Sequence, residues 1–166
     1  MGFSDKAALI DTKIQEEVFY SAAKEGVFEW LKDCEIVKKY PLFENLRFDF
    51  MIKCSSSIGF IEMKSAVLLF DGVYAGYPDC RSVRGRRHIE ELIKLREKGF
   101  RSIVVFAVAH PKAKAFKPYG EGDPIMPVLL RKAQNAGVEI YAFKLALLLS
   151  QNLVEIEDNS LRVVLI

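Results

Sequence analysis

Apolar residues recur at helical spacing near the start of the chain. Residues 12–25 place three apolar side chains on one face, namely Ile14, Val18 and Ala22. Thr12 and Gln15 fit a capping box at the start of this stretch, and Gly26 can end it. We therefore expect a helix over residues 12–25, followed by a short helical turn around residues 27–31.

Two later stretches also predict helices. Residues 83–98 gather their apolar side chains on one side, and Gly99 can stop that helix. Asp123-Pro124 is typical of a helix start, because aspartate caps the free N–H groups and proline suits the first helical position. Gly137 can close this third helix.

Between the helices, apolar runs have the length and spacing of strands. They predict strands at residues 46–54, 59–70, 72–77, 101–110 and 138–143, and a closing hairpin of 153–157 and 161–166. The small polar residues 55–57 form the turn of the first hairpin. The run at 101–110 is almost entirely apolar, as in a central strand buried on both faces. Residues 110–122 contain two prolines and are expected to form a loop.

The order of these elements predicts the fold class. A helix, three strands, a helix, a strand, a helix, a strand and a closing hairpin give an α/β domain with a mixed sheet flanked by helices. With 166 residues, of which 51% are hydrophobic, the chain is long enough for a sizeable core. No repeat or linker divides it, so we expect residues 1–166 to form a single domain.

The net charge and the cysteines limit which partners and which cellular compartment we expect for this chain. The net charge of +2 is too small to indicate a polyanion partner, and no apolar run approaches the roughly 18–20 residues needed to cross a bilayer. Residues 1–13 lack the basic and apolar regions of a secretion signal. Cys34, Cys54 and Cys80 stand far apart, without a CxxC pair. We therefore expect neither a zinc site nor a disulfide framework, and a reducing, cytoplasmic location.

A carboxylate pair and a lysine fall together on the predicted hairpin. Glu62 and Lys64 alternate on one strand and so share a face, and Asp49 lies almost opposite Glu62 if the hairpin turns near residues 55–56. On this register Phe48 and Phe50 point the other way, into the core. Paired carboxylates suit Mg²⁺ or Mn²⁺, and a nearby lysine can orient water or neutralise developing negative charge. A Glu-x-Lys pair is, however, more often a solvated ion pair, and both interpretations stay open on the local pattern.

A basic cluster occupies the start of the second predicted helix, residues 81–88. Helix N-termini attract phosphate, and arginines there oppose the helix dipole unless they contact an anion. This favours phosphate binding by Arg84, Arg87 and His88, with a solvated charge run as the alternative. His88 taken alone is more often a structural histidine.

Other charged residues leave alternatives open. Glu16 and Glu17 of the first helix are candidates for a third carboxylate, although an exposed helix surface is the commoner arrangement. Three lysines of the predicted loop either touch nucleic acid or keep the loop soluble, namely Lys112, Lys114 and Lys117.

Several motifs together resemble a known family. Residues 77–88, YPDCRSVRGRRH, are similar to the FPDA-x-T-x-RG-x-KH signature of the sugar fermentation stimulation protein (SfsA) family. Residues 47–50, RFDF, resemble its SR-[IF]-DF motif, and residues 62–65, EMKS, resemble its EVKS motif. The similarity extends from about residue 8 to residue 147, with the motifs in the family's order.

The resemblance implies a PD-(D/E)xK restriction-endonuclease-like core, DNA binding and nuclease activity. It implies that Asp49, Glu62 and Lys64 fill the nuclease positions, with Asp49 and Glu62 as metal ligands assisted by the Met63 carbonyl. Asp79 is carried over as a signature position near the site, without a role. Pro78-Asp79 is not the PD of the nuclease name, because it follows the Glu-x-Lys strand.

The resemblance also reveals a departure, because family members begin with a small OB-like barrel that this chain is expected to lack. We expect a magnesium- or manganese-dependent nuclease acting on DNA, with RNA as a further substrate. A DNA-binding regulator with a nuclease-like fold is the main alternative, and a domain with no nucleic-acid partner is the third. No membrane partner is expected, and a homodimer is left open.

Overall fold

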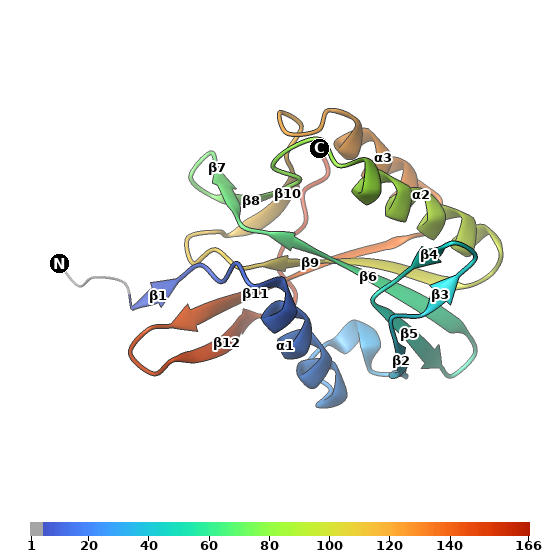
Figure 1. Cartoon of the computed structure of the whole chain (residues 1–166), viewed down its shortest axis with the longest axis horizontal. Helices are drawn as coiled ribbons and strands as arrows, with labels where there is room; N and C mark the ends of the chain where they lie inside the picture. Colours follow the sequence, from blue (N-terminus) through green and yellow to red (C-terminus); the bar gives the residue numbers. More distant parts are fainter. Residues whose placement is uncertain (1–4) are drawn as a thin grey trace.

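The computed structural model describes residues 5–166 (Figure 1). Its helices are α1 (Thr12–Lys24), the short 3₁₀ helix η1 (Glu29–Leu31), α2 (Val83–Glu97) and α3 (Ile125–Asn135). Its strands are β1 (Lys6–Ala7), β2 (Cys34–Lys39), β3 (Leu42–Phe43), β4 (Leu46–Arg47), β5 (Phe50–Cys54), β6 (Ile58–Ala66), β7 (Leu68–Phe70), β8 (Tyr74–Tyr77), β9 (Arg101–Val108), β10 (Ala115–Pro118), β11 (Glu139–Leu148) and β12 (Leu153–Asp158). The predicted mixed α/β fold is confirmed.

The main sheet has seven strands in the order β1-β11-β9-β6-β5-β2, with β12 also paired to β11. The three central strands β6, β9 and β11 are parallel to one another. At one edge of the sheet, β5 pairs antiparallel with β6 and β2 pairs antiparallel with β5. A smaller sheet of β10, β8 and β7 and the β3-β4 ribbon lie beside it. The strands that carry the predicted site therefore lie inside the sheet, next to its antiparallel edge.

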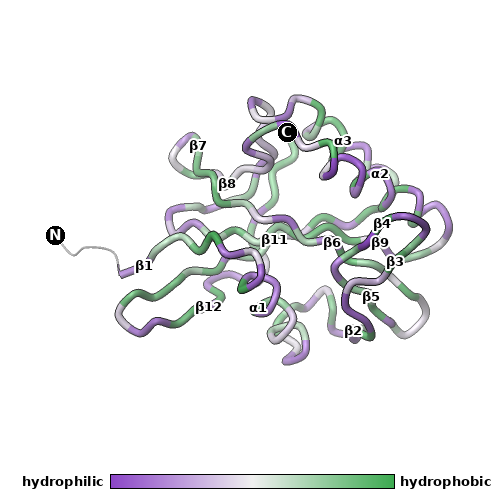
Figure 2. The backbone as a smooth tube through the Cα atoms, viewed as in Figure 1, coloured by the Kyte–Doolittle hydropathy of each residue, from purple (hydrophilic) through white to green (hydrophobic). Residues whose placement is uncertain are grey.

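Alternating side chains of the central strands divide the core between the two faces of the sheet. On β9, Val104 and Phe106 belong to the cluster beneath α2 and α3, while Ile103 and Val105 belong to the cluster that includes Phe19 of α1. Figure 1 shows α2 and α3 on one side of the sheet and α1 on the other. Figure 2 shows hydrophobic stretches in the central strands and hydrophilic stretches along α2. A polar side chain on β6 is thus covered by one of these layers.

The three helices begin close to where the sequence predicts, but the caps differ in detail. Asp11, not Thr12, caps α1, because its Oδ1 accepts from the N–H groups of Lys13 and Ile14 at 2.9 and 3.2 Å. Ser82 caps α2 through the N–H of Gly85. The N-cap of α3 is Pro124, one residue later than predicted, although Asp123 Oδ1 still accepts from Ile125 N at 3.1 Å.

Three strand predictions were wrong. β2 was missed because its side chains are mostly exposed at the sheet edge and lack an apolar alternation. β10 falls within the predicted loop and pairs in parallel with β8, a contact distant in sequence. The closing hairpin is instead formed by β12 with β11, while residues 161–166 cross to Phe116 through a single bridge at Val163.

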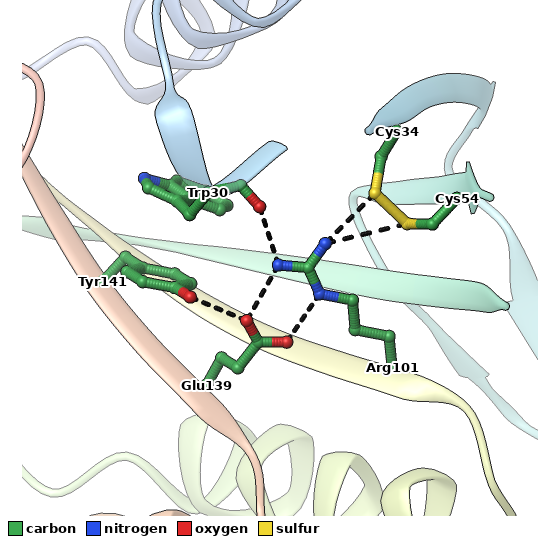
Figure 3. The surroundings of a disulfide bond; sticks show 6 residues. All are labelled: Trp30, Cys34, Cys54, Arg101, Glu139 and Tyr141. Carbon is green, nitrogen blue, oxygen red and sulfur yellow. Dashed lines mark hydrogen bonds and ion pairs between the residues drawn. A yellow bond between two sulfur atoms is a disulfide. The ribbon is translucent and has the colours of Figure 1, made fainter. Parts of the chain in front are cut away.

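The expectation that the cysteines form no disulfide was also wrong. Cys34 and Cys54 are bonded to each other (Figure 3). Cys80 is free and exposed. The two bonded residues stand directly opposite each other in the β2–β5 ladder. Sequence spacing could not show this pairing because it depends on β2, which was not predicted.

Within residues 5–166, no helix is long and apolar enough to cross a membrane. The expectation of no secretion signal concerns residues 1–13, of which residues 1–4 lie outside the described part of the chain.

Gly122 allows the loop before α3 to pack against the backbone that leads into α2. A Cβ atom at this position would lie 2.1 Å from the Pro78 carbonyl oxygen, whereas a Cβ at Gly120 would meet nothing closer than 3.5 Å. We expect Gly122→Ala to lower the free energy of unfolding by about 1–3 kcal/mol, as overpacking does. Gly120→Ala is the matched control, with a change within about 0.5 kcal/mol. Chemical denaturation of both variants measures this, and equal stabilities would contradict the packing argument.

Candidate functional site

Glu62 and Lys64 project from the middle of β6 on the face covered by α2. They pair in register with Val104 and Phe106 of β9, both of which belong to the core beneath α2 and α3. The Glu62 residue is only 4% exposed, and the Lys64 side chain is 12% exposed. The solvated ion pair that a Glu-x-Lys pattern usually forms is therefore excluded here.

Asp49 lies where the chain enters β5. Its N–H donates to the Ile61 carbonyl at 3.1 Å, and its Oδ2 accepts from the Met63 N–H at 2.7 Å. Because the N–H and C=O of a strand residue point to the same side, the Met63 carbonyl faces this corner too. The structure thus brings Asp49 beside Glu62, as the hairpin register predicted.

The backbone around Asp49 differs from the predicted strand in one respect. Phe48 packs in the cluster beneath α2, next to Phe60, while Phe50 packs in the cluster on the α1 side. The prediction that Phe48 and Phe50 share a face was wrong because regular pairing begins only at Phe50. The backbone at Asp49 therefore passes from one face of the sheet to the other. The Asp49 side chain reaches Met63 of β6, beyond the last β6 residue that pairs with β5.

The Glu62 carboxyl is the most constrained group of this site. Its Oε1 lies 2.7 Å from Lys64 Nζ and 3.1 Å from His88 Nδ1, whereas its buried Oε2 has no hydrogen-bond partner in the described part of the chain. Burial raises the pKa of Glu62 to about 8, against the opposing effect of Lys64 and with a further contribution from Asp49. Burial raises the pKa of Asp49 as well, and the Met63 N–H opposes that shift. An unpaired buried carboxyl oxygen carries an energetic cost that a cation would remove.

His88 holds Lys64 from the α2 side. Its Nδ1 lies 3.0 Å from Lys64 Nζ, and its Nε2 lies 3.2 Å from the Arg47 carbonyl. Burial and the Lys64 charge lower the pKa of His88 to about 4, so the ring is neutral and its contact with Glu62 is no ion pair. Nε2–H then donates to Arg47, and Nδ1 accepts from the lysine. His88 is 2% exposed, so the predicted direct contact with substrate phosphate does not fit its position.

The arginines of the basic cluster separate into two groups. Arg84 and Arg87 are exposed on the first turns of α2, and Arg84 lies near enough to lower the pKa of both Glu62 and His88. Arg86 instead forms a bidentate pair with Asp123, at 2.8 and 2.7 Å. Asp79 is exposed beside Cys80, whose pKa it raises, and no described contact joins it to the carboxylate pair.

Tyr40 is a residue near the site that the sequence analysis did not find. It adopts a left-handed φ of 55°, its N–H donates to the Asp49 carbonyl at 2.8 Å, and its hydroxyl donates to the Glu16 carboxylate. This hydrogen bond raises the pKa of Tyr40 to about 12. A left-handed conformation is uncommon for a bulky residue and is one signal of a functional neighbourhood. Glu16 contributes to the raised pKa of Asp49, whereas Glu17 lines a hollow between α1 and β12.

The described residues provide two carboxylate ligands in one corner. Across residues 5–166, no three His, Cys, Asp or Glu side chains gather closely enough to form a metal cluster by themselves. Glu16 therefore does not complete a three-carboxylate set. Two carboxylates and a backbone carbonyl are the kind of partial ligand set on which Mg²⁺ or Mn²⁺ retains waters.

Comparisons with known proteins assign the family. The family model described as "Sugar fermentation stimulation protein RE domain" matches residues 13–151. This chain belongs to the SfsA family. A sugar fermentation stimulation protein homolog from Pyrococcus furiosus is 45% identical over 156 residues, which cover 93% of this chain and 67% of the relative. A homolog from Caldanaerobacter subterraneus is 40% identical over 81% of this chain and 58% of its own length.

A solved SfsA structure agrees with the fold. The Pyrococcus furiosus SfsA structure, described as a complex with Ca²⁺, superposes with a TM-score of 0.89 at 42% identity. The match covers 97% of this chain and 68% of that chain. This chain thus spans between 58% and 68% of the length of these SfsA proteins.

The raised pKa of Glu62 predicts how stability depends on pH. The folded protein binds the Glu62 proton more tightly than the unfolded chain, which lowers the free energy of unfolding as pH rises from 4.5 to about 8. The lowered pKa of His88 has the opposite effect between about 4 and 6.5, so we expect a net fall in the free energy of unfolding between pH 6.5 and about 8. We expect Glu62→Gln to remove most of this slope and to stabilise the protein most at the upper end of the range. Denaturant titrations across this pH range, without divalent cations, measure it. Glu17→Gln controls for loss of an exposed carboxylate, and an unchanged slope in Glu62→Gln would contradict the assignment.

Proposed function

We propose that this chain is a metal-dependent nuclease that hydrolyses phosphodiester bonds in DNA, with RNA as a further substrate. The observation that carries the proposal is the buried, unpartnered Glu62 Oε2 beside Asp49 and Lys64. Burying two carboxyl groups and a lysine costs stability, and this cost is not offset at Glu62 Oε2 by any hydrogen bond from the described residues. Perturbed ionisable groups gathered in this way are typical of a functional site.

The donor set supports Mg²⁺ or Mn²⁺ as the cofactor. Asp49 Oδ1, Glu62 Oε2 and the Met63 carbonyl are hard oxygen donors, which both ions prefer. The Ca²⁺ named for the Pyrococcus furiosus SfsA structure supports divalent-cation binding in this family. When bound, such an ion would supply charge stabilisation and an activated water.

Lys64 is the residue best placed to act on the attacking water. Its ammonium is aimed into the carboxylate corner by Glu62 on one side and His88 on the other, at 2.7 and 3.0 Å. From there it can orient a water or neutralise negative charge as it develops on the phosphate. Because His88 is neutral, its Nδ1 accepts a hydrogen bond from Lys64 and fixes the position of the ammonium group.

Arg84 and Arg87 supply the phosphate contacts in this proposal. Both are exposed on the turn of α2 that lies over the site, and neither is engaged in a described ion pair. Contacts of this kind position a nucleic acid without specifying its sequence. The same exposed arginines support the alternative function, a DNA-binding regulator without catalysis, whose binding would survive EDTA and weaken steeply with salt.

Other features of the whole protein remain proposals of the same kind. A homodimer rests on the sequence alone, and cytoplasmic location rests on the missing secretion-signal pattern, because the Cys34–Cys54 bond removes the cysteine argument for a reducing compartment.

Cleavage assays with matched variants test the proposed activity. We expect cleavage of linear or supercoiled DNA in Mg²⁺ or Mn²⁺ and none in EDTA. Asp49→Asn, Glu62→Gln and Lys64→Met should each reduce the rate by about 10²-fold or more, the scale of a lost transition-state contact. Glu17→Gln and Lys53→Met serve as controls, because both residues are exposed and lie away from the carboxylate corner.

Two outcomes would contradict the nuclease proposal. Cleavage that persists at the parent rate in all three site variants would locate the activity elsewhere or in a contaminant. Metal-independent DNA binding without cleavage would favour the regulator, provided that the salt dependence falls when Arg84 and Arg87 are replaced by glutamine.

A further inference from the structure

A disulfide joins the sheet edge at the end opposite the carboxylate corner. Cys34 is the first residue of β2 and Cys54 the last residue of β5, and both side chains are half-buried. Cys34 lines a hollow of about 210 Å³ with Leu31 and Ile52. Cys54 lines two further open hollows, one of them beside Lys98 and Phe100. Both residues are therefore partly accessible, although they also pack against the core on the α1 side of the sheet.

Arg101 is fixed against this disulfide by several partners (Figure 3). Its Nε and Nη2 donate to the Glu139 carboxylate at 2.6 and 2.8 Å, and Nη2 also donates to the Trp30 carbonyl at 2.7 Å. Tyr141 donates to Glu139 at 2.6 Å and stacks on Trp30 with ring centroids 4.2 Å apart. These contacts leave the guanidinium little freedom to turn away.

The remaining nitrogen of Arg101 points at sulfur. Nη1 lies 3.1 Å from Cys34 Sγ and 3.7 Å from Cys54 Sγ. A neutral disulfide is a weak acceptor and gains little from a guanidinium donor, whereas a thiolate is stabilised strongly by one. Because Cys34 is the closer sulfur, Arg101 favours negative charge on it. The other charged groups around Cys34 act in both directions, since Lys32 and Lys53 favour the thiolate while Asp33, Glu35 and the Arg101-paired Glu139 oppose it.

We propose that Cys34–Cys54 is a reversible thiol–disulfide exchange site for dithiol reductants, in which Arg101 stabilises the Cys34 thiolate. A reductant thiolate attacks Cys54 Sγ and forms a mixed disulfide, while the Cys34–Cys54 bond breaks and its electron pair stays on Cys34. The second thiolate of the reductant then attacks the reductant sulfur that is bonded to Cys54. The new bond closes a disulfide within the reductant, and the Cys54 thiolate is released and takes a proton from water. The reductant is oxidised by two electrons to a disulfide, and the protein is reduced to a dithiol.

Reduction of the disulfide would remove the cross-link between β2 and β5, the strand that begins next to Asp49 of the candidate site. β2 is at the sheet edge and pairs only with β5, so the disulfide is its covalent attachment to the sheet. Tyr40 directly follows β2 and bonds to Asp49, where β5 begins. The proposed chemistry does not depend on nuclease activity, and its test uses no nucleic acid.

The test uses the full chain with Cys80→Ser, so that only Cys34 and Cys54 report. The folded protein is reduced with dithiothreitol, and iodoacetamide labelling is followed for each cysteine by peptide mass spectrometry from pH 5 to 10. We expect reduction without denaturant, and labelling of Cys34 with a midpoint at least one unit below the roughly 8.5 of an ordinary thiol. Arg101→Gln should raise that midpoint and slow the labelling of Cys34 at pH 7 by about 10-fold.

Lys98→Gln, which removes an exposed cation near Cys54, is the control and should leave the Cys34 midpoint unchanged. A Cys34 midpoint at or above about 8.5 in the Cys80→Ser protein would overturn the proposal. So would a disulfide that dithiothreitol reduces only after the protein is unfolded. These two readouts decide the matter even if Arg101→Gln does not fold.

Discussion

The buried contact of Glu62 with Lys64 and His88 is the constraint on which the site depends. A carboxyl, an ammonium and an imidazole meet within 3.1 Å of one another in a layer that is otherwise apolar. Such a group is tolerated in a protein interior when its members satisfy one another, and here Glu62 Oε2 has no hydrogen-bond partner among residues 5–166. The neutral state of His88 and the raised pKa values of Glu62 and Asp49 follow from the same burial.

The pairing of β6 in the sheet fixes the positions of Glu62, Lys64 and Asp49 relative to one another. β6 pairs with β9 from Gly59 to Ala66, whereas its pairing with β5 ends at Ile61, so that the Met63 N–H donates to the Asp49 side chain instead of to a strand. α2 lies over the same face, so that His88 reaches inward while Arg84 stays at the surface. Arg86 fixes this helix to Asp123 at the start of α3. The charges on the rim and the groups within the corner thus come from α2, from β6 and from Asp49, which directly precedes β5.

Part of this arrangement could be predicted from the sequence because it depends on short-range periodicity. Alternation along a strand places Glu62 and Lys64 on one face, and the hairpin register brings Asp49 beside them. The crossing of the chain between Phe48 and Phe50 could not be predicted, because an irregular backbone at a strand end leaves no periodic signal. The role of Arg86, the Tyr40 contact and the Cys34–Cys54 bond likewise depend on partners distant in the chain. β2 itself could not be predicted, because this exposed edge strand has no regular alternation of apolar and polar residues.

The most direct test of this account is to locate a bound cation in a crystal. Crystals of the protein grown with Mn²⁺ and measured at the manganese absorption edge should show one anomalous peak bonded to the carboxylates of Asp49 and Glu62. The peak should be absent from Glu62→Gln crystals grown in the same way. No peak at these residues, with Glu62 still in contact with Lys64 at high Mn²⁺ concentration, would contradict the claim that the buried carboxyl pair is a metal site.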